Sequence, residues 1–137
     1  MDFINFTHSP GVFRVRIDMA KISRELVLRK LSMAFPEPVV AENALRTLDK
    51  LANLAEPAAV DMVQLAIIKL CGGELWRVRD LVQAARDDFA DVVSMAQAPE
   101  RFNYLRAKAS KKRVLTAAER TEMQRRDQWQ WMEWLIS

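Results

Sequence analysis

The chain has 137 residues, half of them apolar, a size at which one domain buries its core without disulfide or metal staples. Cys71 is the one cysteine, which excludes a disulfide within the chain and favours a reducing compartment. The N-terminus lacks a signal-peptide pattern, and no stretch approaches the roughly 18 uninterrupted apolar residues of a membrane span. The sequence therefore predicts a single cytoplasmic domain over residues 1–137.

Turn-forming residues are scarce, with three glycines and five prolines. Ala, Leu, Arg, Glu and Asp dominate, and this composition favours helices over a turn-rich β fold. We expect an all-α protein of about five helices, packed around a central antiparallel helical hairpin and preceded by a short extended N-terminal segment.

Residues 1–18 differ from the rest of the chain. Phe13, Val15 and Ile17 alternate with Arg14 and Arg16, which is the period of a half-exposed strand. The pattern is compatible with a ribbon across the helices, an edge that pairs with a second copy, or a disordered lead-in.

Two helices are predicted next, each ended by proline or by a change of pattern. Asp18 can cap a helix that runs to about Phe35, before Pro36. A cleaner amphipathic pattern covers residues 38–54.

The central hairpin is predicted over residues 57–98. A mostly apolar helix from Pro57 ends at Gly72 or Gly73, either of which can adopt the left-handed conformation. The helix that follows, residues 74–98, carries a 3,4-spaced apolar stripe that predicts its buried face: Leu75, Val78, Val82, Ala85, Phe89, Val92 and Ala96.

A basic connector is predicted over residues 100–115, with no acidic residue between its cations, and with Phe102 and Tyr104 among them. The net charge of +3 is concentrated here, because residues 101–137 hold 9 basic against 4 acidic residues. Such a stretch can neutralise phosphates while aromatic rings stack on bases, and it is also typical of a solvated connector or of a contact with an acidic protein. The possible nucleic-acid-binding residues are Arg101, Arg106, Lys108, Lys111, Lys112 and Arg113.

The C-terminal helix is predicted over residues 116–137 by the capping-box pair Thr116 and Glu119. Its end carries apolar residues on two sectors, because successive residues turn by about 100°. Either the end inserts between layers of its own domain, or one sector is an interface with aromatic anchors. The predicted partner-binding residues are Met123, Trp129, Trp131, Met132, Trp134 and Leu135.

The sequence gives little support for a catalytic or metal site. Asp87, Asp88 and Asp91 have the DDxxD spacing with which some isoprenoid synthases hold magnesium, but no second acidic cluster accompanies them. His8 is the one histidine, far in sequence from Cys71, so neither a nucleophile dyad nor a zinc site of the usual ligands is predicted. We expect no cofactor and no enzymatic activity.

Three stretches carry a resemblance to short bacterial proteins of unknown function. They are residues 63–70 with 73–75, residues 88–93, and the pair of segments 115–120 and 131–135. The resemblance covers residues 57–137 and implies a bacterial, helical, non-secreted protein, without an activity to transfer.

The sequence thus leads to two functional hypotheses. The first is a small cytoplasmic interaction or assembly protein that binds itself or another protein through the Trp-rich C-terminal helix. The alternative is a nucleic-acid-associated protein that uses the basic stretch at 101–113.

Overall fold

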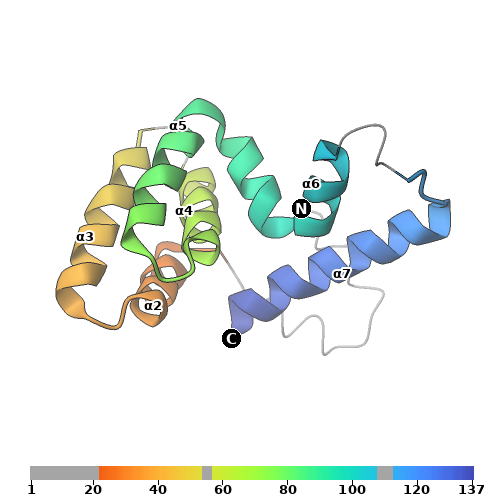
Figure 1. Cartoon of the computed structure of the whole chain (residues 1–137). Helices are drawn as coiled ribbons and strands as arrows, with labels where there is room; N and C mark the ends of the chain where they lie inside the picture. Colours follow the sequence, from red (N-terminus) through yellow and green to blue (C-terminus); the bar gives the residue numbers. More distant parts are fainter. Residues whose placement is uncertain (1–21, 54–56, 108–112) are drawn as a thin grey trace.

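The computed structural model describes residues 22–53, 57–107 and 113–137, and every regular element within them is helical (Figure 1). This confirms the predicted all-α class. The predicted extended segment at 1–18 lies outside the described residues. The elements in chain order are α2 (Arg24–Ala34), α3 (Pro38–Leu48), the 3-10 helix η2 (Asp49–Leu51), α4 (Pro57–Cys71), α5 (Leu75–Gln97), α6 (Pro99–Arg106) and α7 (Ala117–Ile136).

The first described helix begins later than the sequence indicated. Ile22 and Ser23 are not helical, and the Ser23 hydroxyl accepts a hydrogen bond from the Leu26 N–H at 3.2 Å. Ser23 is therefore the N-cap of α2, and the prediction of Asp18 in that role was wrong.

The extensive contact between α4 and α5 forms the centre of the molecule. Gly72 and Gly73 join the two helices, and both have positive φ values, 60° and 77°. Gly73 also lies close to the end of α2, since a Cβ there would be 3.4 Å from the Ala34 carbonyl oxygen. The glycine pair therefore allows both the turn between α4 and α5 and the close approach to α2.

A buried polar cluster fixes α4 against the helices before it. Gln64 is fully buried, and its Nε2 donates to the Leu48 carbonyl at 2.9 Å. Its Oε1 accepts from Arg24 at 3.0 Å, and Arg24 also pairs with Asp49 at 3.1 Å. The cluster satisfies the buried amide and joins α2, α4 and the end of α3.

Helix α5 is broken at Asp88, whose φ of −157° and ψ of 92° are not helical. The Asp88 side chain accepts the Asp91 N–H at 3.2 Å, so it acts as an N-cap for the second part of the helix. Figure 1 shows that this second part turns away from α3 toward α6. The break also corrects the predicted stripe, because Phe89 is 39% exposed, whereas Val78, Val82, Ala85, Val92 and Ala96 are buried.

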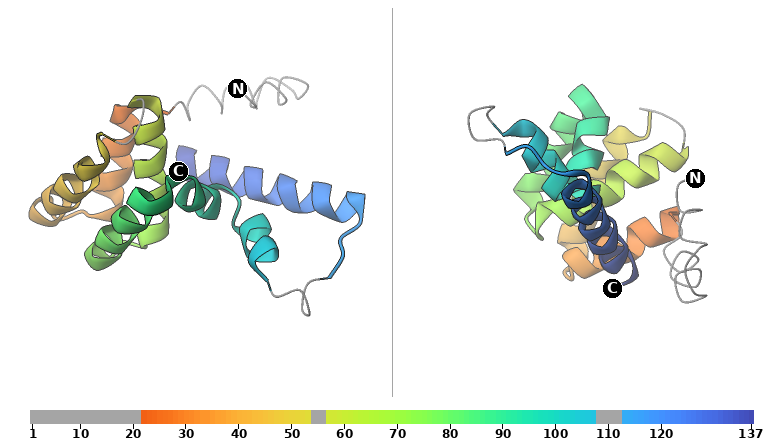
Figure 2. Two further views of the ribbon diagram at one scale, coloured as in Figure 1. Left: turned by 90° about the horizontal axis from the view of Figure 1, so that it is seen from above. Right: turned by 90° about the vertical axis from the view of Figure 1, so that its right-hand side faces the viewer.

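The beginning of the predicted connector is helix α6, which lies between α5 and α7 in the chain and contacts both. Helix α7 has its C-terminal end beside α2, and its N-terminal end lies far from α2, α3 and α4 (Figures 1 and 2). None of the helices described here is long and apolar enough to cross a membrane.

Candidate interaction surface on the C-terminal helix

Helix α7 starts with the capping box that the sequence predicted. The Thr116 hydroxyl accepts from the Glu119 N–H at 3.1 Å, and the Glu119 carboxylate accepts from the Thr116 N–H at 2.9 Å. The hydrogen bond from the Thr116 backbone N–H, followed by that from the Arg113 side chain, holds the pKa of the Glu119 carboxylate below its usual range. Two of the N–H groups at the start of the helix are thereby satisfied.

The inner face of α7, which we define as Asp127, Trp131, Met132 and Leu135, is buried in the chain's own core. Trp131 and Met132 are each 3% exposed, and Leu135 is fully buried. Three of the six residues predicted to bind a partner are therefore engaged within the fold.

Cationic side chains from α2 hold the C-terminal end of α7. Lys30, only 2% exposed, donates to the Trp134 carbonyl and to the Ser137 hydroxyl, the latter at 2.9 Å. Arg29 donates to the Leu135 carbonyl at 3.2 Å. Burial, assisted by the Arg29 charge, lowers the pKa of Lys30. These contacts satisfy carbonyls that a helix end leaves unpaired and place positive charge at the negative end of its dipole.

Two lysines also flank a pair of stacked indoles. The rings of Trp131 and Trp134 have centroids 5.4 Å apart and planes 24° apart. Lys30 lies 4.8 Å from the Trp134 centroid, and Lys69 lies 5.9 Å from that of Trp131. Burial lowers the pKa of Lys69, while the Asp127 charge opposes this effect. Such cation–π contacts add to the apolar packing of the pair.

Lys69 and Trp131 differ in how their polar atoms are satisfied. The Lys69 ammonium donates to the Ala96 carbonyl at 2.6 Å, near the end of α5. The Trp131 Nε1, by contrast, is buried without a hydrogen-bond partner in the part of the chain that the structure describes. The ring is thus held by its apolar contacts and by stacking, which offset the desolvation cost of its unpaired N–H group.

Asp127 attaches α7 to α6. Its carboxylate is 3% exposed and accepts the backbone N–H groups of Glu100 and Arg101, each at 3.1 Å. Helix α6 has no capping side chain at its own N-cap, so a residue of α7 takes that role. The Arg126 guanidinium also donates two hydrogen bonds to the Glu100 carboxylate, at 2.9 and 2.8 Å. This contact holds the pKa of Glu100 below its usual range and raises that of Arg126.

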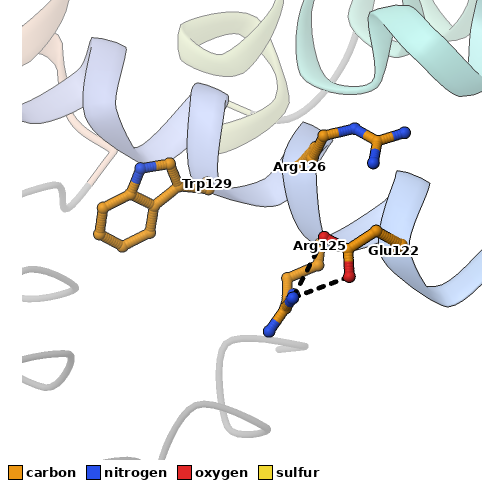
Figure 3. A pocket seen from close by; sticks show the side chains of 4 residues that line it. All are labelled: Glu122, Arg125, Arg126 and Trp129. Carbon is orange, nitrogen blue, oxygen red and sulfur yellow. Dashed lines mark hydrogen bonds and ion pairs between the residues drawn. The ribbon is translucent and has the colours of Figure 1, made fainter.

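The outer face of α7 is the side opposite Trp131, and we define it by its exposed residues, Glu122, Arg125, Arg126, Trp129 and Glu133. Ile136 follows on this side but packs against the core. Trp129 is 42% exposed. Four of these residues line a hollow of about 370 Å³ (Figure 3): Glu122, Arg125, Arg126 and Trp129. Arg125 holds Glu122 through contacts of 2.7 and 3.1 Å, so the hollow combines an aromatic ring with a defined ion pair.

The remaining predicted partner-binding residues lie between these extremes. Trp134 is half-buried against Lys30, and Met123 is half-buried nearer the start of α7. Of the predicted set, Trp129 has the greatest exposure, and it is the residue around which a contact surface can be built.

Of the three cations of the basic stretch that the structure describes, two are ion-paired within the chain. Arg106 lies 3.6 Å from Asp91 and packs over the Phe102 ring, and Arg113 pairs with Glu119 at 2.7 Å. The Arg101 side chain is exposed on α6. Lys108, Lys111 and Lys112 lie outside the described residues.

Two aspartates of the DDxxD stretch have structural roles. Asp88 caps the second part of α5 and Asp91 pairs with Arg106, and no group of three acidic, histidine or cysteine side chains suited to a metal occurs within residues 22–53, 57–107 and 113–137. Cys71 is buried, its thiol donates to the Ile68 carbonyl at 3.2 Å, and burial raises its pKa. His8 lies outside the described residues.

Sequence reasoning missed three charged groups that attach α7: the buried Lys30 and Asp127, and the half-buried Lys69. A signal for Asp127 was present, because it lies four residues before Trp131 and eight before Leu135, on the same side of the helix. The two lysines have no comparable signal, since their acceptors are backbone carbonyls far along the chain.

Comparison of the chain with models of known protein families, with curated proteins and with solved structures found no match.

Proposed function

We propose that this chain is a small interaction protein that presents the outer face of α7 to a protein partner. The observation that carries the proposal is the position of Trp129, which is 42% exposed and borders the hollow beside Arg125 and Arg126. Tryptophan and arginine are the residues most enriched among the energetic anchors of protein interfaces.

The attachment of α7 supports this proposal. The inner face is fixed by apolar burial, by the stacked indoles and by the lysines, while Asp127 and Arg126 tie the middle of the helix to α6. A face held on a fixed helix loses little conformational freedom when a partner binds. The outer face therefore has the pre-organisation that an interface needs.

The composition of the outer face also fits a protein contact. A large aromatic ring is surrounded by side chains of both signs, and the ion pairs of Arg125 and Arg126 define their positions. Interfaces commonly combine an apolar centre with a polar rim in this way.

The test is photo-crosslinking in the cells that make the protein. Benzoylphenylalanine would replace Trp129 in one variant and Trp76, a 55% exposed tryptophan on α5, in a matched control. We expect ultraviolet light to give a discrete adduct from position 129 and none from position 76. No adduct from position 129, or the same adducts from both positions, would contradict the proposal.

A further inference from the structure

We propose that the end of the molecule formed by α6 and the start of α7 attaches the chain to the surface of an anionic phospholipid membrane. The contact is made by an apolar and basic patch, which we call the tip patch and define as Leu105, Arg106, Arg113, Val114 and Arg120. The tip patch is separate from the outer face of α7, so this inference does not depend on the proposed function.

The tip patch lies where the chain passes from α6 to α7. The Tyr104 hydroxyl donates to the Arg113 carbonyl at 2.6 Å, which joins the last turn of α6 to the segment before α7. Leu105 and Val114 each follow one of these two residues in the chain. The start of α7 lies far from α2, α3 and α4 (Figures 1 and 2), so the patch is at a projecting end that a flat surface can approach.

Two aliphatic side chains of the tip patch are exposed to solvent. Val114 is 86% exposed, more than any other large apolar residue in the part of the chain that the structure describes, and Leu105 is 56% exposed. Exposed aliphatic surface is unfavourable in water, and its transfer to the boundary between lipid headgroups and acyl chains is favourable. Both side chains therefore gain from shallow insertion into a bilayer.

The charge around these side chains complements an anionic surface. Residues 104–120 contain six basic residues and one acidic residue, a net charge of +5; three of the basic residues are lysines outside the described residues and enter here only as charge. Arg106 pairs with Asp91 and Arg113 with Glu119, but both pairs are exposed, and such pairs are weak. With Asp91 counted as well, the net charge is still +4. Basic residues beside exposed apolar groups are the combination that binds anionic lipid surfaces.

The aromatic residues of the same region favour lipid over nucleic acid. Proteins that bind single-stranded nucleic acid stack its bases on aromatic rings. Here Phe102 and Tyr104 are partly buried, and the Arg106 guanidinium lies 5.2 Å from the Phe102 ring centroid. The exposed apolar side chains of the tip patch are instead aliphatic, and these match acyl chains better than they match bases.

The first experiment is sedimentation of the full chain with unilamellar vesicles of phosphatidylcholine, either alone or with phosphatidylglycerol in about a 3:1 ratio. We expect a partition constant for the anionic vesicles that exceeds that for the neutral vesicles by about tenfold or more. Raising the ionic strength to roughly 0.5 M should release much of the bound chain, because salt screens the attraction. Failure of the chain to pellet with the anionic vesicles would overturn the inference.

A double variant tests the insertion of the apolar side chains. Leu105→Ser together with Val114→Ser keeps every charge, and we expect it to lower the partition constant for the anionic vesicles by about tenfold or more. The matched control is Met33→Ser together with Val39→Ser, at positions 54% and 69% exposed, which should leave the partition constant unchanged. Circular dichroism melting curves check that each variant is folded. Equal binding by the Leu105 and Val114 double variant and the unaltered chain, or an equal loss in the control, would overturn the inference.

Nucleic acid is the competing occupant, and fluorescence anisotropy of a labelled single-stranded oligonucleotide tests it. Charge attracts the chain to both ligands, but the aliphatic side chains add to the binding of lipid alone. We therefore expect anionic vesicles to displace any bound oligonucleotide, and neutral vesicles to leave it bound. An oligonucleotide that anionic vesicles do not displace would assign this end of the molecule to nucleic acid and overturn the inference.

Discussion

Trp129 and Trp131 are two residues apart on one helix, yet they differ in almost every physical property. Trp131 is 3% exposed, stacks on Trp134 and has Lys69 over its ring. Trp129 is 42% exposed and borders a hollow at the surface. Because two residues turn the helix by about 200°, the same residue type faces the core in one case and the outside in the other.

The comparison shows that a run of tryptophans need not have one role. The inner face of α7 accounts for the attachment of the helix, through Asp127, Trp131, Met132 and Leu135. The outer face makes no comparable contribution to the core. Stability and partner binding are thus assigned to different sides of one helix, and mutations on the two sides should separate them.

The largest expected difference between the two faces comes from replacing Trp131 and Trp129, in separate variants, by alanine. Trp131→Ala removes a fully packed ring from beneath α7 and should lower the free energy of unfolding by about 3–5 kcal/mol. Trp129→Ala at the outer face should lower it by less than about 1 kcal/mol. Urea unfolding followed by circular dichroism measures both values.

Association with a partner should also distinguish the two variants, but here the larger effect is expected at Trp129. Trp129→Ala should weaken association, while its unfolding midpoint stays close to that of the unaltered chain. Equal losses of stability in both variants would contradict the assignment of the two faces.

The next effect concerns a polar residue of the inner face. Asp127→Asn keeps the size of the side chain but replaces one of the carboxylate oxygens that accept the Glu100 and Arg101 N–H groups. We expect a loss of about 1–2 kcal/mol, because the buried cap of α6 loses its charge and one acceptor. In this variant, hydrogen exchange of the α6 backbone amides should become faster, and exchange of the α4 amides should change less.

Glu122→Gln is the matched change on the outer face. Glu122 pairs with Arg125 at an exposed position, and exposed pairs contribute little. This variant should change the free energy of unfolding by no more than about 0.5 kcal/mol. If Asp127→Asn were equally mild, the capping of α6 by α7 would have no energetic importance.

Local features of the fold could be predicted from the sequence because local residues produce them. The capping box of Thr116 and Glu119, the glycine pair before α5 and the apolar period of α5 all follow from residues within a few positions of one another. The hydrogen bonds and torsion angles involved are set within the segment itself.

The break of α5 was not predicted, although its residues are also local. Asp88 stands within a continuous apolar period, and an aspartate in a helix is equally compatible with an exposed position. Whether it caps a new helix depends on where the second part of α5 packs. Its contacts with α6 and α7 decide that, and these lie later in the chain.

The candidate surface could be predicted only in part. The two apolar sectors of α7 were visible, but their roles depend on Lys30, Lys69 and Ala96, which lie in α2, α4 and α5. Such long-range contacts between a side chain and a backbone carbonyl leave no spacing signal in the sequence. The sequence therefore identified the helix, and the fold distinguished its inner face from its outer face.

The smallest effect concerns the ion pair by which Arg126, an outer-face residue that borders the inner face, holds Glu100 of α6. The Arg126 guanidinium holds the pKa of Glu100 below its ordinary value of 4.5. A depressed carboxyl pKa means that the unfolded chain binds the proton more readily, so stability rises with pH in this window. The contribution of Glu100 is fully present above about pH 4.5 and is lost as the pH falls through the depressed pKa. Both side chains are about half exposed, so solvent screening keeps the effect small.

Glu100→Gln removes the titrating group and keeps a similar shape. The difference in urea midpoint between this variant and the unaltered chain should be constant from pH 7 to about pH 5 and should shrink below about pH 4.5. The other ionisable groups are the same in both proteins, so their contributions cancel in the difference. A midpoint difference that persisted at pH 3 would show that Glu100 acts through packing and not through its charge, and the edge of α7 would then belong with the inner face.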